Sequence, residues 1–323
     1  MKIAILGAGG TGSCVGYFLR KAGDEVWLVD INEAHMAAVR ENGLHVILSD
    51  LKRNTETNET ICMHATTDAA EAGPCDLVVI LTKEPATKKA IEGARALFGE
   101  NTFVLMMQNG IGNEDVLLQF FPRERIGRGV ATVSSTLVAP GEIHGRFGAD
   151  PLLLRFGSLA GDKPQQLTTL LEHLNAAGAD SELSTNILKT VWDKALINLP
   201  TSFITGLVGV PAPGILAVTA GRNLMSSVLE EAINVAAACG IDYDKEKEIS
   251  YFLTIYGPHM AKFSSAARDM FSHRETEIEA INGAIERLGI KYGIPTPVNS
   301  TIANLIRTIQ QTYPEQENAQ RLA

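Results

Sequence analysis

The six residues GAGGTG at 7–12 have the spacing of a phosphate-binding turn between a strand and a helix. They follow an apolar run at 2–6 and precede a segment with helical periodicity. In such a turn the first glycine permits a tight bend, the second lets the backbone approach a pyrophosphate, and the third lets helix and strand pack closely. The N–H groups and partial positive charge of the helix start attract phosphates. We therefore predict that Gly7, Ala8, Gly9, Gly10, Thr11 and Gly12 bind a dinucleotide, although glycine-rich turns also occur without a ligand.

An acidic residue ends the next apolar run. Asp30 comes 18 residues after Gly12, close to the spacing of about 20 at which an acid binds the adenosine ribose. A carboxylate there accepts hydrogen bonds from the ribose hydroxyls and repels a 2′-phosphate, and the next basic residue is Arg40. This pattern favours NAD as the cofactor, with NADP as the alternative. The other interpretation of Asp30 is a turn or helix cap.

Two later stretches combine polar side chains with apolar neighbours. QNGIGN at 108–113 follows the apolar run 102–106, and ligands bind at the carboxyl ends of parallel strands. Asn109 there either holds a nicotinamide or substrate oxygen or forms an Asn-Gly turn. In WDKALIN at 192–198, Lys194 and Asn198 lie four residues apart at the edge of an apolar helical stripe. The alternative is a lysine that covers apolar surface while its charge reaches water.

A third stretch, 264–283, places an acid beside apolar residues. We predict a helix over 275–292, on which Glu277, Ile281, Ala284 and Leu288 share one face. A carboxylate on the apolar side of a helix needs a partner, because burying an unpaired charge is costly. Lys194 is the expected partner of Glu277.

These blocks resemble the ketopantoate reductase family, which comprises 2-dehydropantoate 2-reductases and related D-2-hydroxyacid dehydrogenases. The resemblance runs along nearly the whole chain and rests on GAGGTG at 7–12, LTK at 81–83, QNGIGNE at 108–114, WDKALIN at 192–198 and SSAARDMFSHRETEIEAINGAI at 264–285. It implies reduction of a 2-oxo acid to the D-2-hydroxy acid by hydride transfer from NAD(P)H. The expected alternatives are a reductase of β-oxo acids with the same architecture and a non-catalytic NADH-binding regulatory protein.

The resemblance also implies roles for individual residues. Lys194 would be the general acid and Glu277 its carboxylate partner. The implied substrate ligands are Asn109, Asn198, Ser202 and Ser265, and the implied cofactor contacts beyond the glycine turn and Asp30 are Thr82, Lys83, Asn109 and Gly110.

Two departures from the family pattern bear on the substrate and the cofactor. Pantoate-making members carry a basic residue where this chain has Asp30 and Ile31. Ser202 stands where the family has a second substrate asparagine, and Pro200 precedes it in the predicted helix, where proline removes a hydrogen bond. Both departures favour a relative that reduces other branched or aromatic 2-oxo acids with NADH.

The elements that would position these residues follow from the apolar periodicity. Strands are predicted at 2–6, 25–30, 76–82 and 102–106, helices at 33–42, 85–98 and 164–177, and a β-rich stretch at 125–156. After about residue 183 only helices are predicted, at 185–205, 214–239, 244–255, 275–292 and 298–311. The expected fold is α/β: a Rossmann-type doubly wound sheet with an antiparallel extension over 1–183, which binds the dinucleotide, and an all-helical substrate domain over 184–323.

Composition limits the partners. The 323 residues suit two domains, and a net charge of −9 argues against a nucleic-acid partner. No apolar run approaches the length of about 20 residues that a membrane span needs. The four cysteines and seven histidines show no metal-ligand spacing, so we expect no metal and buried, reduced thiols. A soluble, cytoplasmic homodimer that acts on a small-molecule 2-oxo acid is the resulting expectation.

Overall fold

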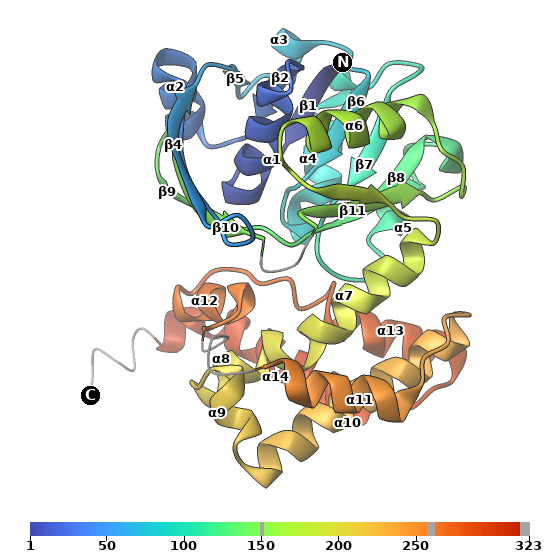
Figure 1. The fold of residues 1–323 in the computed structure, drawn as a ribbon. Coiled ribbons are helices and arrows are strands. Elements are labelled where there is room, and N and C mark those ends of the chain that lie inside the picture. Colours follow the sequence, from blue (N-terminus) through green and yellow to red (C-terminus); the bar gives the residue numbers. More distant parts are fainter. Residues whose placement is uncertain (149–151, 257–261, 317–323) are drawn as a thin grey trace. The chain divides into compact units, whose positions relative to one another are not determined.

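The computed structural model describes residues 1–148, 152–256 and 262–316, which fall into two compact units. The first, here called the sheet unit, comprises Met1–Gln108 and Asn113–Val191. The second, the helical unit, comprises Asn109–Gly112 and Trp192–Ala323. The predicted fold class is confirmed, since the first unit is built on sheets and the second on helices (Figure 1).

The main sheet of the first unit has eight strands in the order β12-β11-β8-β7-β6-β1-β2-β5. Their bounds are β1 (Lys2–Leu6), β2 (Glu25–Val29), β5 (His64–Thr66), β6 (Leu77–Ile80), β7 (Phe103–Met106), β8 (Ile126–Ala131), β11 (Leu154–Ser158) and β12 (Ser181–Leu183). The strands from β5 to β8 pair in parallel, and β11 pairs antiparallel with β8. The strand order reverses between β1 and β6, where open α/β sheets bind ligands.

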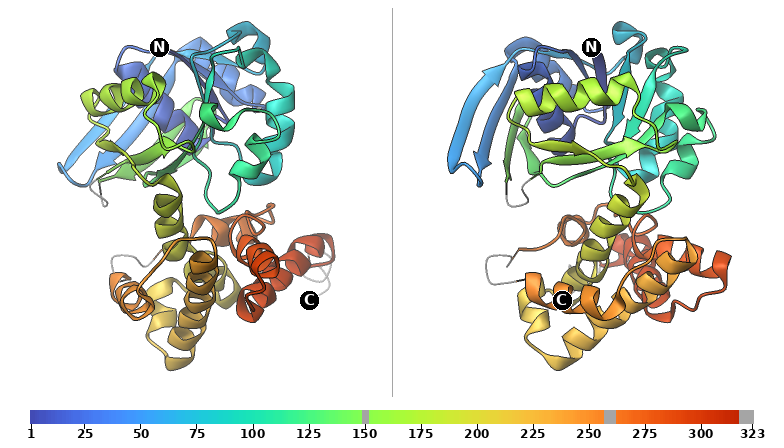
Figure 2. Two further views of the ribbon diagram at one scale, coloured as in Figure 1. Left: turned by 90° about the vertical axis from the view of Figure 1, so that its right-hand side faces the viewer. Right: turned by 45° about the vertical axis from the view of Figure 1, so that its right-hand side comes forward.

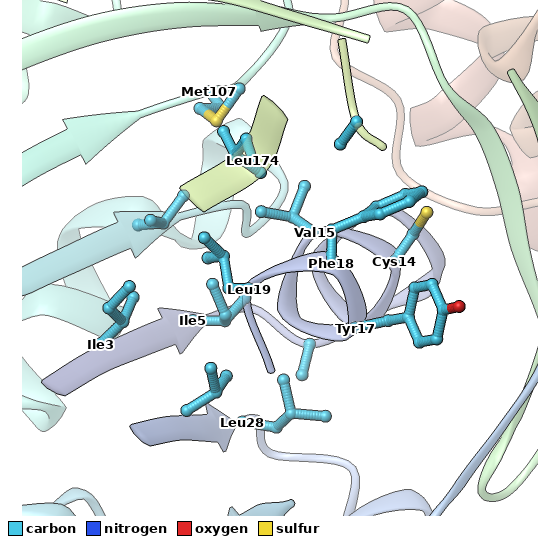
Figure 3. Packing of buried hydrophobic residues seen from close by; sticks show 14 of the residues in the cluster. Ile3, Ile5, Cys14, Val15, Tyr17, Phe18, Leu19, Leu28, Met107 and Leu174 are labelled. Atoms are coloured by element: carbon cyan, nitrogen blue, oxygen red, sulfur yellow. The ribbon is translucent and has the colours of Figure 1, made fainter. Parts of the chain in front are cut away.

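Helices cover both faces of this sheet. They are α1 (Gly10–Lys21), α2 (Glu33–Asn42), α3 (Ala69–Ala72), α4 (Thr87–Gly93), α5 (Glu114–Leu117) and α6 (Gln165–Ala176), with short 3₁₀ segments η1 (Glu84–Ala86), η2 (Arg95–Leu97) and η3 (Arg123–Arg125). Alternate residues of β1 enter two different cores. Ile3 and Ile5 pack with α1, α2 and α6, as Figure 3 shows for Ile5 beside Leu19, whereas Ala4 and Leu6 pack with α3, α4 and α5. The sheet is therefore doubly wound.

The predicted antiparallel extension is present as β11 beside β8, and a second sheet takes up the rest of the stretch 125–156. The order of this second sheet is β4-β3-β10-β9, with β3 (Leu44–Asp50), β4 (Thr55–Ile61), β9 (Ser134–Ala139) and β10 (Glu142–Phe147). The stretch 125–156 therefore divides, because β8 and β11 join the main sheet while the β9–β10 hairpin pairs through β10 with β3. Strand β4, TETNETI, is mostly exposed and lacks apolar alternation, so its sequence did not predict a strand.

The helical unit is an assembly of packed helices, which Figure 2 shows from two sides. They are α7 (Ile187–Ser202), α8 (Ile204–Val208), α9 (Ala212–Leu216), α10 (Thr219–Ala238), α11 (Lys245–Ile255), α12 (Ser265–Phe271), α13 (Asn282–Tyr292) and α14 (Pro297–Gln311). The chain passes between the two units within α7, after Val191. Among the described residues, no helix has the length and apolarity needed to cross a bilayer.

Candidate active site

The glycine turn has the geometry that its spacing predicts. Gly7 has φ +97°, and a Cβ atom there would lie 2.4 Å from the backbone nitrogen of Thr82, so only glycine fits. A Cβ at Gly12 would lie 2.1 Å from the carbonyl oxygen of Gly7. At Gly9, in contrast, a Cβ would meet nothing within 4 Å. The tight turn and the close helix–strand packing are therefore present, and the open space lies at the glycine that would approach a pyrophosphate.

Gly10 has a function in the fold that the motif alone did not predict. A Cβ atom there would lie 2.6 Å from the carbonyl oxygen of Ser135 on β9. The second sheet therefore packs directly against the start of α1. Ala8 is buried, and Thr11 is half-buried within the first turn of α1.

Asp30 forms a turn at the end of β2. Its Oδ1 accepts a hydrogen bond of 2.9 Å from the backbone N–H of Asn32, and the Asn32 side chain caps helix α2 by accepting from His35 N–H. Ile31, between them, is 96% exposed. The turn interpretation of Asp30 is thus correct for one oxygen, and ribose binding by the carboxylate stays a prediction.

The ends of β6 and β7 are tied together by Gln108, the first residue of the QNGIGN stretch, to which the sequence analysis gave no role. Its buried Nε2 lies 2.6 Å from the carbonyl oxygen of Thr82 and 2.6 Å from Thr87 Oγ1. Thr82 is half-buried, whereas Lys83 is exposed at the start of η1. Gln108 thereby fixes the segment that approaches Gly7. Its place directly after a buried strand was the available signal.

The residues Asn109–Gly112 pack within the helical unit. Gly110 has φ +98°, and the Ile111 N–H donates a 2.9 Å hydrogen bond to the carbonyl oxygen of Ala280. The Asn-Gly turn expected as one interpretation of this stretch is therefore present at Gly110. The half-buried Asn109 is two residues before this hydrogen bond, which connects the turn to the segment that contains Glu277.

Helix α7 carries three of the predicted residues at intervals of four. Lys194 and Asn198 are half-buried, and Ser202 is 6% exposed. The helix continues through Pro200 to Ser202, so the three residues follow one face. Tyr256 Oη donates a 3.1 Å hydrogen bond to the carbonyl oxygen of Ile197, one turn before Thr201.

The start of α12 is joined to the end of α7. Ser264 Oγ donates a 2.6 Å hydrogen bond to the carbonyl oxygen of Ser202 and accepts from Ala267 N–H, which caps α12. Ser265, the predicted substrate ligand, is exposed in the first turn of that helix. The structure therefore brings the segments of Ser202 and Ser265 together through Ser264.

The predicted helix over 275–292 is wrong at its start. Glu277 lies in a non-helical segment, and α13 begins only at Asn282. The Thr276 N–H donates to Gln310 Oε1 at 2.6 Å, which ties the segment before α13 to α14. Glu277 therefore does not share a helix face with Ala284 and Leu288.

Both members of the predicted acid–base pair belong to the helical unit. Lys194 lies on α7 and Glu277 on the segment before α13, and each side chain is half-buried. Their pairing stays a prediction. Glu279, two residues on, has a different partner, since Arg307 of α14 binds it through two hydrogen bonds of 2.7 and 2.8 Å.

The expectation for the cysteines holds only in part. Cys14 and Cys75 are buried, and burial raises the pKa of the Cys14 thiol to about 12. Cys62 is exposed, because it follows the exposed strand β4. Within the described ranges, no group of three or more His, Cys, Asp or Glu side chains is arranged to hold a metal ion.

Two family models match the chain. The model of ketopantoate reductase PanE/ApbA matches residues 3–158, and the model of the ketopantoate reductase PanE/ApbA C terminal matches residues 186–310. A 2-dehydropantoate 2-reductase of Pyrococcus abyssi is 30% identical over 308 residues, which cover 95% of this chain and 97% of the relative. One of Streptococcus pyogenes is 29% identical over 307 residues, with the same coverage of 95% and 97%.

Solved structures are also similar to this chain over nearly its whole length. D-mandelate dehydrogenase with NADH and anilino(oxo)acetate has a TM-score of 0.85 at 28% identity, covering 97% of this chain and 99% of that chain. A PanE/ApbA family ketopantoate reductase from Ralstonia eutropha has a TM-score of 0.84 at 26% identity, with coverage of 97% and 99%. This chain belongs to the ketopantoate reductase PanE/ApbA family.

Proposed function

We propose that this chain is a nicotinamide-dependent oxidoreductase that reduces a 2-oxo acid to the D-2-hydroxy acid. Membership of the family, matched in both its parts, supports this function. The observation that carries the proposal is the glycine turn, which lies at the reversal of strand order and has open space at Gly9. We assign dinucleotide binding to residues 1–183 and substrate binding with catalysis to 184–323.

The cofactor half of the site consists of main-chain groups and a few side chains. Gly7, Ala8, Gly9, Gly10, Thr11, Gly12, Asp30, Thr82, Lys83, Asn109 and Gly110 are the proposed cofactor-binding residues. Helix α1 offers its first-turn N–H groups to the phosphates, because these have no partner within the helix itself. When bound, the reduced nicotinamide supplies the hydride for the keto carbon.

NADH is the proposed preferred cofactor, with NADPH as the alternative. The carboxylate of Asp30 gives one oxygen to Asn32 N–H, which leaves the other oxygen to accept from ribose hydroxyls. A 2′-phosphate would meet this negative charge and the exposed, apolar Ile31. The NADH in the structures of the similar D-mandelate dehydrogenase also supports this preference.

The catalytic groups come from the helical unit. Lys194 donates a proton to the keto oxygen as that oxygen gains negative charge, and Glu277 orients the ammonium group. Such proton transfer contributes about 10²–10⁴-fold to the rate. Asn198, Ser202 and Ser265, with Asn109, hold the carboxylate and carbonyl groups of the substrate, so that the reacting carbon is correctly oriented.

The proposed substrate class depends on the named relatives and on Asp30 and Ser202. Relatives named 2-dehydropantoate 2-reductase point to ketopantoate, and the similar D-mandelate dehydrogenase points to an aromatic 2-oxo acid. Ser202 is smaller than the asparagine expected at its place, and Asp30 disfavours NADPH. We therefore propose another branched or an aromatic 2-oxo acid as the preferred substrate, with ketopantoate as the alternative.

The test is oxidation of NADH and of NADPH by the purified full chain with a panel of acids. The panel contains ketopantoate, phenylglyoxylate, branched 2-oxo acids and a β-oxo acid. Oxidation with 2-oxo acids, and formation of the D-hydroxy acid on a chiral column, is the expected result. Oxidation only with the β-oxo acid would show the alternative reductase, and NADH binding without turnover would show a regulatory protein.

The assembly and the cellular location are further parts of the proposal. We propose a homodimer in the cytoplasm, with a small-molecule substrate and neither nucleic acid nor membrane as a partner. Exposed Val208 and Val218 beside α8 and α10 support an apolar contact between copies. Light scattering of the full chain in solution measures the mass of the assembly, and a monomeric mass would contradict this part.

A further inference from the structure

A buried histidine joins the glycine turn to the second sheet. His35, on α2, is 0% exposed. Its Nδ1 accepts a 2.9 Å hydrogen bond from the backbone N–H of Gly141, which lies in the turn between β9 and β10. Its Nε2 lies 3.2 Å from Ser13 Oγ on α1, and Ser13 Oγ donates a 2.8 Å hydrogen bond to the carbonyl oxygen of Ala8. The four groups form one chain that ends inside the GAGGTG turn.

The direction of every bond in this chain is fixed. A serine hydroxyl has one proton, and Ser13 donates it to the Ala8 carbonyl oxygen, which can only accept. His35 Nε2 must therefore carry a proton and donate to Ser13. The Gly141 N–H can only donate, so Nδ1 must carry no proton. The ring is consequently neutral, with its proton on Nε2.

The surroundings favour this neutral form. Burial lowers the pKa of His35 below its ordinary value, against the opposing effects of Asp30 and of the Ala8 carbonyl. A protonated ring would place an N–H group at Nδ1, directly opposite the N–H of Gly141. Two donors would then face each other without an acceptor.

The chain ends at the peptide group whose N–H would face the cofactor. In a trans peptide the C=O and the following N–H point in opposite directions within one plane. Ser13 holds the Ala8 carbonyl oxygen toward α1, so the Gly9 N–H points away from Ser13. The space at Gly9 is open on the side where a Cβ would lie. Ser13 therefore restrains the orientation of this N–H.

The second sheet fixes the other end. Gly141 has φ +78°, and a Cβ atom there would lie 3.0 Å from Ala38 Cβ on α2. The β9–β10 turn thus packs directly against α2, one helical turn after His35. Backbone close contact between Gly10 and Ser135 holds the same hairpin against α1. The bond from Gly141 to His35 therefore comes from a firmly placed donor.

We propose that His35 and Ser13 are positioning residues that set the affinity for the dinucleotide by holding the Ala8–Gly9 peptide with its N–H toward the phosphates. The proposal rests on the proposed function, because it concerns the same cofactor site. Neither residue touches the cofactor. Both act through the main chain of the glycine turn, and neither belongs to the GxGxxG pattern.

The test compares two buried hydroxyl groups in the full chain. Ser13→Ala removes the link to Ala8. The control, Thr102→Val, removes a hydroxyl that is equally buried, donates to the Cys75 carbonyl oxygen at 2.6 Å and accepts from Gly99 N–H at 2.8 Å. Thr102 precedes β7, at the opposite end of the sheet from the glycine turn. Both variants are expected to lower the midpoint of unfolding, but only Ser13→Ala is expected to alter the cofactor site.

NADH affinity, measured by fluorescence without substrate, is the deciding readout. For Ser13→Ala the Kd for NADH is expected to rise about five- to twentyfold, the effect of one lost orienting hydrogen bond. The Kd of Thr102→Val stays within about twofold of the original. In turnover, Ser13→Ala raises KM for NADH while kcat at saturating NADH is kept, which a general loss of folded protein would not produce.

Two variants of His35 test the part of the hydrogen-bond chain that lies between Gly141 and Ser13. His35→Gln offers an amide N–H near the place of Nε2, and His35→Leu offers no donor. The Kd of the glutamine variant is expected to lie nearer the original. Equal Kd values for Ser13→Ala and Thr102→Val, in a protein that binds NADH, would overturn this inference alone. Absence of NADH and NADPH binding by the original chain would overturn the proposed function, and this inference with it.

Discussion

The carbonyl oxygen of Gly7 lies only 2.1 Å from the place where a Cβ atom at Gly12 would be. The first turn of α1 and the end of β1 are therefore in direct backbone contact. This contact brings the N-terminus of α1 to the end of β1 and leaves Gly9 as the open member of the turn. The glycines of the motif consequently differ in what they do.

Substitution by alanine separates these functions. Gly12→Ala is expected to lower the free energy of unfolding by about 2–4 kcal/mol, because two backbone segments must move apart. Gly9→Ala is expected to change it by no more than about 0.5 kcal/mol, since Gly9 has extended backbone (φ −68°, ψ −162°) and open space. Its Kd for NADH rises more than about tenfold because the methyl group occupies the approach of the pyrophosphate.

Gly93→Ala is the matched control, since a Cβ there also meets nothing within 4 Å and the residue lies at the end of α4. Urea denaturation measures the free energy of unfolding, and NADH fluorescence measures the Kd for NADH. Unchanged NADH binding by Gly9→Ala would show that no phosphate passes over this glycine.

Cofactor preference depends on the charge at the end of β2. Asp30→Asn keeps an oxygen that can accept from Asn32 N–H, so the turn survives, but it removes the negative charge. The ratio of the Kd values for NADH and NADPH is expected to shift toward NADPH by about ten- to a hundredfold. Glu33→Gln, three residues later in the first turn of α2, is the control for a loss of charge near Asp30. A ratio that moves equally in both variants would argue against a specific ribose contact.

The stability of the helical unit depends on a buried cap. Glu231 on α10 accepts hydrogen bonds from Val298 N–H at 2.8 Å and from Asn299 N–H at 2.9 Å, at the start of α14. Glu231→Ala is expected to lower the free energy of unfolding by about 2–4 kcal/mol, because several buried donors lose their acceptor. Glu230→Ala removes an exposed carboxylate that pairs with Lys245 and should cost less than about 1 kcal/mol. Urea denaturation measures the free energy of unfolding of both variants. Equal losses in Glu231→Ala and Glu230→Ala would contradict the capping role of Glu231.

The pair of Glu279 and Arg307 predicts a pH dependence. Hydrogen bonds from Arg307 lower the pKa of Glu279 below 4.5 in the folded state. Its contribution to stability is therefore present above pH 4.5 and is lost as the pH falls through the lower, folded-state value. Because both side chains are partly exposed, Glu279→Gln should cost no more than about 1 kcal/mol at neutral pH. Denaturation curves of the two proteins should converge in acid, and a difference that grows there would contradict this sign.

Local patterns predicted much of the sheet unit. The apolar runs and the glycine turn predicted β1, α1, β2 and α2, because burial of those segments leaves a clear period in the sequence. Strand β4 was not predicted, since its side chains are mostly exposed and it is held by pairing with β3. Helix α12 was also missed, and the helix at 275–292 was placed too early, since α13 begins only at Asn282.

The candidate site also contains relations within one element, which the sequence predicted, and contacts between elements, which it did not. Lys194 and Asn198 could be selected from spacing on one helix, because their relation is local. The link from Gly141 through His35 to Ala8 could not, because it depends on a fold that brings residues 106 positions apart into contact. The same holds for Ser264, whose bond to Ser202 spans 62 residues. Spacing reports contacts within one element, whereas contacts between elements need the assembled structure.

Removal of one ammonium group tests the catalytic proposal most directly. Lys194→Ala is compared with Lys189→Ala, a change on the same helix but on another face, using the preferred 2-oxo acid at saturating NADH. The proposal predicts that kcat of Lys194→Ala falls about 10²–10⁴-fold while its Kd for NADH is unchanged, and that Lys189→Ala keeps near-original kcat. Near-original turnover of Lys194→Ala would contradict the assignment of Lys194 as the proton donor.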